Sequence, residues 1–201
     1  MSRKVGCLHL YLAEMAASKT TTLLLRGKAE SAIAGTKVLY SNSVMDTRSD
    51  SFFSSHGDAL NPDFSGIVGI KVKRLSELPQ GYDVYLIDEG QFDDDIVEEV
   101  YRMVLVEKKF VIVAALMGDT DLQPMGKVFG LLPLVAPRGL FRLVAKCERC
   151  IKEGVPRENA DAGYTRLRDG RSKSSSVDIG GLEMYEPCCL YHHPISHQSD
   201  A

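Results

Sequence analysis

Short apolar runs that alternate with helical stretches are the feature that most constrains the fold of this chain. Each run has the length and the continuous hydrophobicity of a buried parallel strand. The runs lie at residues 5–12, 37–40, 82–87 and 110–116, and the helical stretches lie at 19–34 and 95–107. Strand–helix–strand units close by right-handed crossovers. The sequence therefore predicts a layered α/β fold, with a parallel sheet and helices on both of its faces.

Length and charge limit the class of protein. The 201 residues, 44% of them hydrophobic, suffice for one ordinary domain with a real core and a small appendage. The net charge of -3 comes from 24 basic and 27 acidic residues that are mixed along the chain, which gives no surface for gripping a nucleic-acid backbone. No apolar run is long enough for a membrane span or a convincing signal peptide. We therefore expect a cytoplasmic protein that binds a nucleotide rather than a polymer.

The segment between the first predicted strand and the first predicted helix has the frame of a phosphate-binding loop. In the pattern G-x-x-x-x-G-K-[ST], backbone N–H groups and a lysine hold phosphates, and a hydroxyl serves Mg²⁺. Lys19 and Thr20 keep the last two positions, whereas Ala13 and Ser18 occupy the glycine positions. A non-glycine residue forced into a left-handed conformation costs of order 1 kcal/mol or more. The alternative is an ordinary helix whose first turn Ser18 caps.

Two acidic residues follow the third apolar run. Asp88 and Glu89 come at the carboxyl end of the predicted strand 82–87. At this place in a parallel sheet an aspartate can hold Mg²⁺, and an adjacent carboxylate can face the attacking group. The alternative is that the pair only ends the strand in a solvated loop, since residues 93–95 are acidic as well.

Cysteine spacing in the last third of the chain predicts a metal site. Cys147 and Cys150 form a C-x-x-C pair, and Cys189 and His192 form a second pair of the same spacing. Two such pairs complete a tetrahedral Cys₃His site of the structural kind. A small, loop-rich module with little hydrophobic core needs a cross-link such as a bound metal ion to stay folded, so we expect a structural Zn²⁺.

Neighbouring residues leave alternatives for this site. Cys188 and His193 adjoin predicted ligands, and either could replace one of them. A redox role for the C-x-x-C pair has no thioredoxin-like context to support it. Cys7 lies in an apolar run, where packing is a more common role than chemistry.

The sequence pattern changes near residue 143. Beyond it Cys, Gly, Arg and Ser become frequent and the apolar periodicity fades. We therefore predict a nucleotide-binding α/β domain at 1–143, a zinc-binding module at 144–194 and a disordered tail at 195–201. The polar stretches at 50–65 and 168–176 are predicted to be loops.

Together with several further stretches, these motifs resemble the thymidine kinase family of the cytosolic, zinc-containing type. The further stretches lie at 46–48, 55–57, 87–92, 111–116, 131–134 and 179–181, with Tyr185 after the last. The resemblance covers nearly the whole chain. It implies a P-loop NTPase-like α/β domain, a zinc-bound lasso module that closes over the nucleoside, and a homotetramer. It also implies thymidine and ATP as substrates, Mg²⁺ with the ATP, and feedback binding of dTTP.

The resemblance assigns roles to particular residues. It implies that Glu89 is the general base for the 5′-hydroxyl and that Arg48 steadies the transferring phosphoryl group. Lys19 would hold the β- and γ-phosphates, and Thr20 and Asp88 would serve Mg²⁺. The remaining loop residues expected at the phosphates are Met15, Ala16, Ala17 and Ser18, and the nucleoside contacts are expected from Met15, Phe92, Leu116, Thr165, Gly180, Gly181 and Tyr185. The alternatives are a surface ion pair for Arg48 and plain packing for Phe92, Leu116 and Tyr185.

The chain departs from the family pattern in two stretches. The family's loop reads G-P-M-F-[SA]-G-K-[ST], so positions 13, 14, 16 and 18 differ, and Glu14 brings a negative charge toward phosphates. Thr120 and Asp93 replace aromatic residues. The main prediction is a thymidine kinase of deoxynucleoside salvage, which transfers the γ-phosphate of ATP to the 5′-hydroxyl of thymidine. The alternatives are a catalytically weakened nucleotide-binding relative with a binding or assembly role, and a kinase for another nucleoside such as deoxyuridine.

Overall fold

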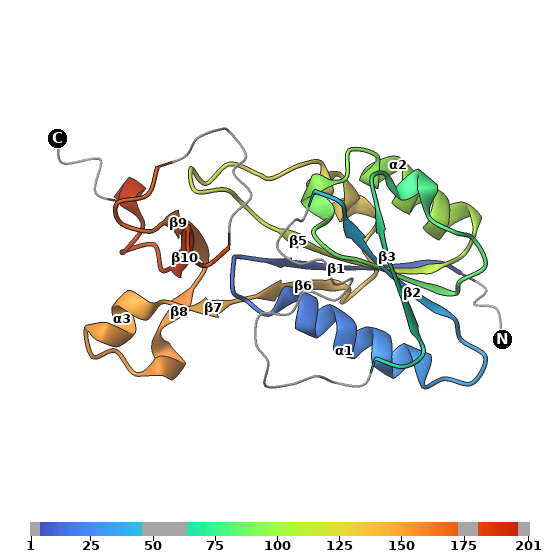
Figure 1. Cartoon of the computed structure of the whole chain (residues 1–201), viewed down its shortest axis with the longest axis horizontal. Helices are drawn as coiled ribbons and strands as arrows, with labels where there is room; N and C mark the ends of the chain where they lie inside the picture. The colour runs from blue at the N-terminus through green and yellow to red at the C-terminus, as the bar shows by residue number, and fades with distance from the viewer. Residues whose placement is uncertain (1–4, 46–63, 173–180, 197–201) are drawn as a thin grey trace.

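A parallel sheet forms the centre of the molecule in the computed structural model, which describes residues 5–45, 64–172 and 181–196. The sheet has six strands in this described part, in the order β3-β2-β4-β5-β1-β6 (Figure 1). Every neighbouring pair runs parallel. The strands are β1 (Cys7–Ala13), β2 (Val38–Ser43), β3 (Ile67–Val72), β4 (Val84–Ile87), β5 (Phe110–Leu116) and β6 (Leu140–Leu143). The predicted α/β fold class is therefore confirmed.

Helices cover both faces of this sheet. On one face lies α1 (Lys19–Ser31), whose Leu23 and Leu24 pack against Tyr40, Leu86 and Ile112. The other face carries α2 (Ile96–Tyr101), a π-helical turn (Arg102–Val106) and a 3₁₀ segment (Val128–Leu134). Figure 1 shows α1 below and α2 above the sheet. Strands buried on both faces have continuous apolar runs, which is why the central ones were recognisable in the sequence.

The two edge strands, β3 and β6, were not predicted. β3 contains Gly69 and Lys71, and its Val68 is exposed. β6 is a short strand with Arg142 in it, and most of its residues are exposed. An edge strand has only one neighbour and need not be apolar on both faces, so the pattern of a buried strand does not find it.

The residues after 144 form a smaller group of elements beside the sheet. β7 (Ala145–Lys146) pairs antiparallel with β8 (Asp161–Ala162), and β9 (Tyr164–Leu167) pairs antiparallel with β10 (Tyr185–Cys188). The group also contains α3 (Glu148–Lys152) and the 3₁₀ turn Arg157–Asn159. In Figure 1 it lies at the end of the sheet toward which β1 runs. We call these residues, 144–196, the small module; the domain boundary at 143 stays a prediction.

Small residues join the small module to the loop that follows β1. Ala13 and Ala17 pack in one buried cluster with Ala145, Cys147 and Cys188. Short side chains allow the two backbones to approach closely. The small module is therefore positioned directly against the predicted phosphate loop.

Several sequence predictions fall outside the described residues. They are the motifs at 46–48 and 55–57, most of the loop at 50–65, the second half of the loop at 168–176, and the tail beyond 196. Short 3₁₀ turns complete the described elements, at Leu75–Glu77 and Gly90–Phe92. Among the described helices, none has both the length and the apolar character needed to cross a membrane.

Candidate functional site

The glycine pattern of the loop between β1 and α1 predicts a left-handed backbone at positions 13 and 18, and the structure has it at 18 but not at 13. Ser18, directly before α1, has a φ of 58° and is left-handed, and its side chain makes no capping bond to the helix within the described residues. Ala13 is the last residue of β1 and is not left-handed, so the expectation of strain at position 13 was wrong. The second left-handed residue of the loop is Ala16, with a φ of 59°. The cost of a left-handed non-glycine residue therefore falls on positions 16 and 18, of which only 18 is a glycine position of the pattern.

Lys19 and Thr20 extend from the start of α1 toward different partners. The Lys19 side chain is 7% exposed, and its Nζ donates a hydrogen bond to the carbonyl oxygen of Glu14 at 3.3 Å. The ammonium therefore folds back over the loop. The Thr20 hydroxyl donates to Oδ2 of Asp88 at 2.6 Å, across 68 residues of sequence. The predicted pair of groups for Mg²⁺ is thus in direct contact.

Asp88 is buried at the carboxyl end of β4 and is held by several donors. Besides Thr20, the Tyr40 hydroxyl donates to Oδ2 at 2.9 Å, and the Glu89 N–H donates to Oδ1 at 3.0 Å. Burial raises the pKa of Asp88 to about 6, and the charge of Glu89 adds to the rise. The hydrogen bonds from Thr20 and Tyr40 and the charge of Lys19 act in the opposite direction. Tyr40 was not predicted from the sequence.

Glu89 is a buried carboxylate whose orientation is set by its neighbours. Its backbone is left-handed, with a φ of 53°, and the 3₁₀ turn Gly90–Phe92 follows at once. This turn brings Gln91 back, so that its Nε2 donates to Oε2 of Glu89 at 2.5 Å. The amide oxygen of Gln91 accepts from the N–H of Leu116 at 2.9 Å. Gln91 stands in the motif at 87–92, yet sequence reasoning gave it no role; here it anchors Glu89 to the end of β5.

Thr165 was expected at the nucleoside, and the structure places it against the loop that follows β1. Its Oγ1 accepts from the N–H of Met15 at 3.2 Å and lies 3.5 Å from Oε2 of Glu14 as a donor. Glu14 is only 3% exposed. Burial raises the pKa of Glu14 to about 7, while the charges of Arg142 and Lys19 and the Thr165 hydroxyl lower it. β9 is therefore hydrogen-bonded directly to the loop after β1.

A cavity of about 220 Å³ opens beside this contact. Glu14 and Tyr164 form part of its wall, and the segment that follows β5 supplies much of the rest, including Asp119 and Phe129. The cavity thus lies where the loop after β1, the segment after β5 and β9 meet. Leu116 and Thr165, both expected at a nucleoside, each precede or follow a lining residue in the sequence.

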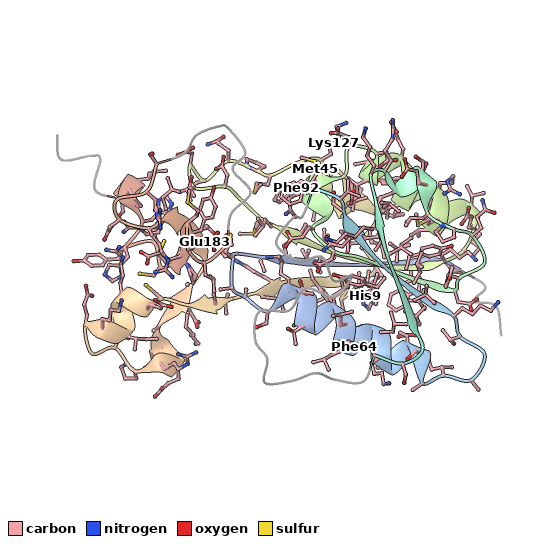
Figure 2. The ribbon with its side chains drawn as sticks, in the orientation of Figure 1. His9, Met45, Phe64, Phe92, Lys127 and Glu183 are labelled. Atoms are coloured by element: carbon pink, nitrogen blue, oxygen red, sulfur yellow. The ribbon has the colours of Figure 1, made fainter. Side chains whose placement is uncertain are left out.

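The other predicted nucleoside residues are more scattered. Met15 and Tyr185 are buried, and Phe92 is half-buried. Figure 2 shows Phe92 in the upper part of the sheet domain and Glu183, two residues before Tyr185, in the small module. Gly181 is buried. Gly180 and Arg48 lie outside the described residues.

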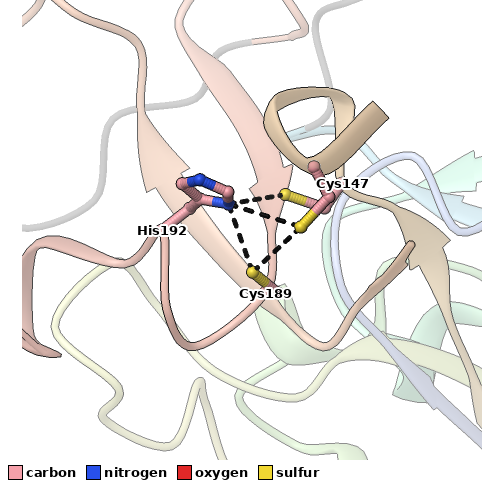
Figure 3. Close-up of side chains that lie close together, drawn as sticks. Cys147, Cys189 and His192 are labelled. Carbon is pink, nitrogen blue, oxygen red and sulfur yellow. Dashed lines mark hydrogen bonds between the residues drawn. The ribbon is translucent and has the colours of Figure 1, made fainter. Parts of the chain in front are cut away.

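The four predicted metal ligands form one compact cluster. One ligand atom from each of Cys147, Cys150, Cys189 and His192 lies within 4.8 Å of all the others. Nδ1 of His192 is 3.4, 3.5 and 3.3 Å from the sulfurs of Cys147, Cys150 and Cys189, in that order (Figure 3). The bond lengths of a tetrahedral zinc site imply ligand separations of roughly 3.5 to 3.8 Å. Three thiolates and one imidazole at this spacing fit Zn²⁺.

The two alternative ligands point elsewhere. Cys188 is fully buried in the cluster with Ala13 and Ala17, and burial raises the pKa of its thiol to about 12. His193 is also fully buried, and its Nδ1 accepts from the N–H of Ile195 at 3.3 Å. Among the described residues, neither belongs to the metal cluster. Cys7, as expected, packs at the border of the hydrophobic core between α1 and the sheet.

Comparison with known proteins places this geometry in a family. The family model described as thymidine kinase matches residues 6–193. Human "Thymidine kinase, cytosolic" is 32% identical over 188 residues, which cover 94% of this chain and 73% of the human protein. A variola virus thymidine kinase is 33% identical over 187 residues, covering 92% and 94% of the two chains. A thymidine kinase of Oryza sativa subsp. japonica is 29% identical over 194 residues, covering 94% of this chain and 66% of the plant protein. The match extends from β1 through the metal cluster, and the chain belongs to the thymidine kinase family.

Proposed function

We propose that this protein transfers the γ-phosphate of ATP to the 5′-hydroxyl of thymidine. The observation that carries the proposal is the contact of Thr20 with Asp88, next to a second buried carboxylate on Glu89 that Gln91 holds in place. A hydroxyl and a carboxylate are the oxygen ligands that Mg²⁺ takes in phosphoryl-transfer sites. The choice of thymidine as the substrate rests on the family and on the names of the relatives.

The residues around the loop have distinct parts in this reaction. Lys19 leaves the carbonyl of Glu14 and binds the β- and γ-phosphates, which are stronger acceptors than a peptide oxygen. Thr20 and Asp88 would hold Mg²⁺, which would supply positive charge to offset the charge developing on the phosphoryl oxygens. Glu89 accepts the proton of the attacking hydroxyl, which requires its ionised form. We assign Arg48 to the transferring phosphoryl group, as the family pattern implies.

The zinc cluster serves the nucleoside side of the site. A structural zinc held by the cluster would join α3 to the loop after β10 within the predicted lasso module, 144–194, which also contains β9 and β10. We propose that Phe92, Leu116, Gly180, Gly181 and Tyr185 contact the nucleoside when the lasso module closes over it, as the resemblance implies. Thr165 contributes indirectly, because its hydroxyl group hydrogen-bonds to Met15 and Glu14 and so holds the loop after β1 in position.

We also propose a cytoplasmic location, a homotetramer and feedback binding of dTTP. The word "cytosolic" in the name of the human relative supports the first. The other two rest on the resemblance of the motifs. Size-exclusion chromatography with light scattering tests the tetramer, which a monomeric mass would rule out. The transfer assay with and without dTTP tests the feedback, which unchanged transfer would rule out.

A weakened nucleotide-binding relative is the second candidate. The left-handed Ala16 and Ser18 and the buried carboxyl of Glu14 favour it, because they strain the loop and place an ionisable acid beside it. In this case the chain still binds ATP, with little transfer. A variant with glycine at both 16 and 18 relieves the two left-handed positions, and its transfer activity separates the two candidates. A protein that is zinc-loaded and folded but inactive even then is a binding protein.

The direct test is transfer of labelled γ-phosphate from ATP to thymidine by the zinc-loaded protein. Deoxyuridine and deoxycytidine, run in parallel, define the specificity. The Glu89→Gln variant is expected to bind both substrates and to lose transfer by a factor of about 100 or more. Glu98→Gln, an equal change of charge on the exposed face of α2, is the matched control. Full turnover by Glu89→Gln would show that Glu89 is not the base.

A further inference from the structure

His192 presents its two ring nitrogens to different surroundings. Nδ1 faces the three cysteine sulfurs, at 3.3 to 3.5 Å. Nε2, on the opposite side of the ring, is 2.9 Å from Oε1 of Glu153. A neutral imidazole carries one proton, and a nitrogen that binds a metal must be free of it. With zinc on Nδ1, the proton is on Nε2 and donates to the Glu153 carboxylate.

The end of α3 fixes the position of Glu153. Its backbone N–H donates to the carbonyl oxygen of Arg149 at 3.0 Å, which completes the helix. Gly154 follows with a φ of 91°, in the left-handed conformation common after helix ends, and its N–H donates to the Ile151 carbonyl oxygen at 3.1 Å. The N–H of Val155 then donates to the carbonyl oxygen of Cys150 at 2.9 Å. These hydrogen bonds fix the backbone of Glu153 relative to Cys147 and Cys150, which belong to the same short segment.

This arrangement links the two halves of the metal site. The segment 147–155 supplies two thiolates and, through Glu153, a partner for a third ligand that comes from the loop after β10. The two partners differ in exposure: the Glu153 side chain is 57% exposed to solvent, whereas the His192 side chain is 10% exposed. Water can therefore reach Nε2 once Glu153 is removed, and the ring loses its fixed orientation.

We propose that Glu153 is a positioning residue for zinc, which holds His192 in the tautomer and orientation that bind the metal through Nδ1. A carboxylate on the distal nitrogen also makes the imidazole a stronger donor to the metal, and such partners contribute about 10- to 100-fold to metal affinity. Because Glu153 is more than half exposed, the lower end of this range applies. The inference concerns the metal site alone and holds whether or not the protein phosphorylates thymidine.

Metal affinity of the full-length protein provides the test. Zinc is titrated away with a chromogenic chelator from the wild type, Glu153→Ala, Glu153→Gln and the control Glu148→Gln. Glu148 is an exposed acid in the first turn of the same helix, so its loss changes the charge of α3 without touching His192. We expect affinity to fall about 10-fold in Glu153→Ala. It should fall less in Glu153→Gln, whose amide oxygen still accepts a hydrogen bond, and stay unchanged in the control. Equal affinities in Glu153→Ala and the wild type would overturn the proposal.

A second comparison separates positioning from general destabilisation. In the His192→Cys background the site has four thiolates and no imidazole to orient, so adding Glu153→Ala should no longer lower zinc affinity. Substitution of Co²⁺ for zinc gives a visible absorption that reports the ligand field, and it should shift in Glu153→Ala but not in Glu148→Gln. A loss of affinity that persists in the His192→Cys background would show that Glu153 acts through folding and not through His192. If His192→Cys does not fold, the Co²⁺ spectra decide alone.

Discussion

Replacing Glu14 by glutamine changes the pH dependence of stability in a direction that the structure fixes. Glu14 is 3% exposed, and burial raises its pKa from 4.5 to about 7, against the lowering effects of Arg142 and Lys19. Between these two pH values the folded protein holds a proton that the unfolded chain has released. The free energy of unfolding therefore falls as pH rises through this window, and above it the folded protein carries a buried carboxylate.

The size of the effect follows from the same shift. A difference of one pKa unit corresponds to 1.36 kcal/mol, so a rise from 4.5 to about 7 corresponds to about 3 kcal/mol at most. Local relaxation and entry of water reduce this, so we expect about 1 to 3 kcal/mol. Glutamine has nearly the same shape and does not ionise. The Glu14→Gln variant should thus match the wild type near pH 5 and be more stable by this amount near pH 8.

Urea unfolding of zinc-loaded protein near pH 5 and pH 8 measures this difference. Other ionisable groups also contribute to the pH dependence, so the quantity to compare is variant minus wild type at each pH. Glu98→Gln, in which an exposed carboxylate is lost, should show a difference near zero at both values. A Glu14→Gln difference that is the same at pH 5 and pH 8 would refute the reasoning, because it would mean that Glu14 keeps an ordinary pKa in the folded protein.

Three further predictions concern the loop and its contacts. Ser18→Gly should raise the free energy of unfolding by about 1 kcal/mol by relieving a left-handed backbone, whereas Ala13→Gly should lower it because position 13 is an ordinary strand residue; urea unfolding compares the two. Gln91→Ala should lower kcat about 10-fold or more with little change in KM for thymidine, because Glu89 loses its anchor; a change in KM alone would contradict this role. Thr165→Val should cost about 1 to 3 kcal/mol by leaving the Met15 N–H without its acceptor, while Thr165→Ser should stay near the wild type; equal stability of the two variants would argue against the contact.

Local sequence patterns were sufficient for the metal cluster and for the pairing of Thr20 with Asp88. Cys147 is the residue directly before α3 and Cys150 lies in its first turn, while Cys189 and His192 share one turn after β10, so each pair is set by its own spacing. Asp88 was placed correctly because the carboxyl ends of parallel strands meet at the edge where the loop after β1 also lies.

Tyr40 shows what such patterns miss. Its hydroxyl reaches Asp88 only because β2 lies beside β4 in a register that pairs Tyr40 with Leu86. Neither the strand order nor the register is encoded in the residues near Tyr40, which read as an ordinary apolar strand. The strain at Ala16 was missed for a related reason: the glycine pattern marks two positions, whereas the backbone conformation is set by the whole turn.

Two departures from the family pattern, Ala13 and Glu14, both contact the small module in the structure. Glu14 replaces a proline of that pattern, and its carboxyl lies against Thr165 of β9, whose hydroxyl oxygen also accepts the N–H of Met15. Ala13 replaces a glycine, and it packs with Ala17, Cys147 and Cys188. Two of the four altered side chains of the loop, those of Ala13 and Glu14, thus face the small module, whereas Ala16 and Ser18 are exposed. Because β9 pairs with β10, which leads into Cys189, the cluster of three cysteines and His192 supports the strand that holds the loop. The shape of the loop between β1 and α1 is therefore a joint property of the sheet and of the small module, and not of the loop sequence alone.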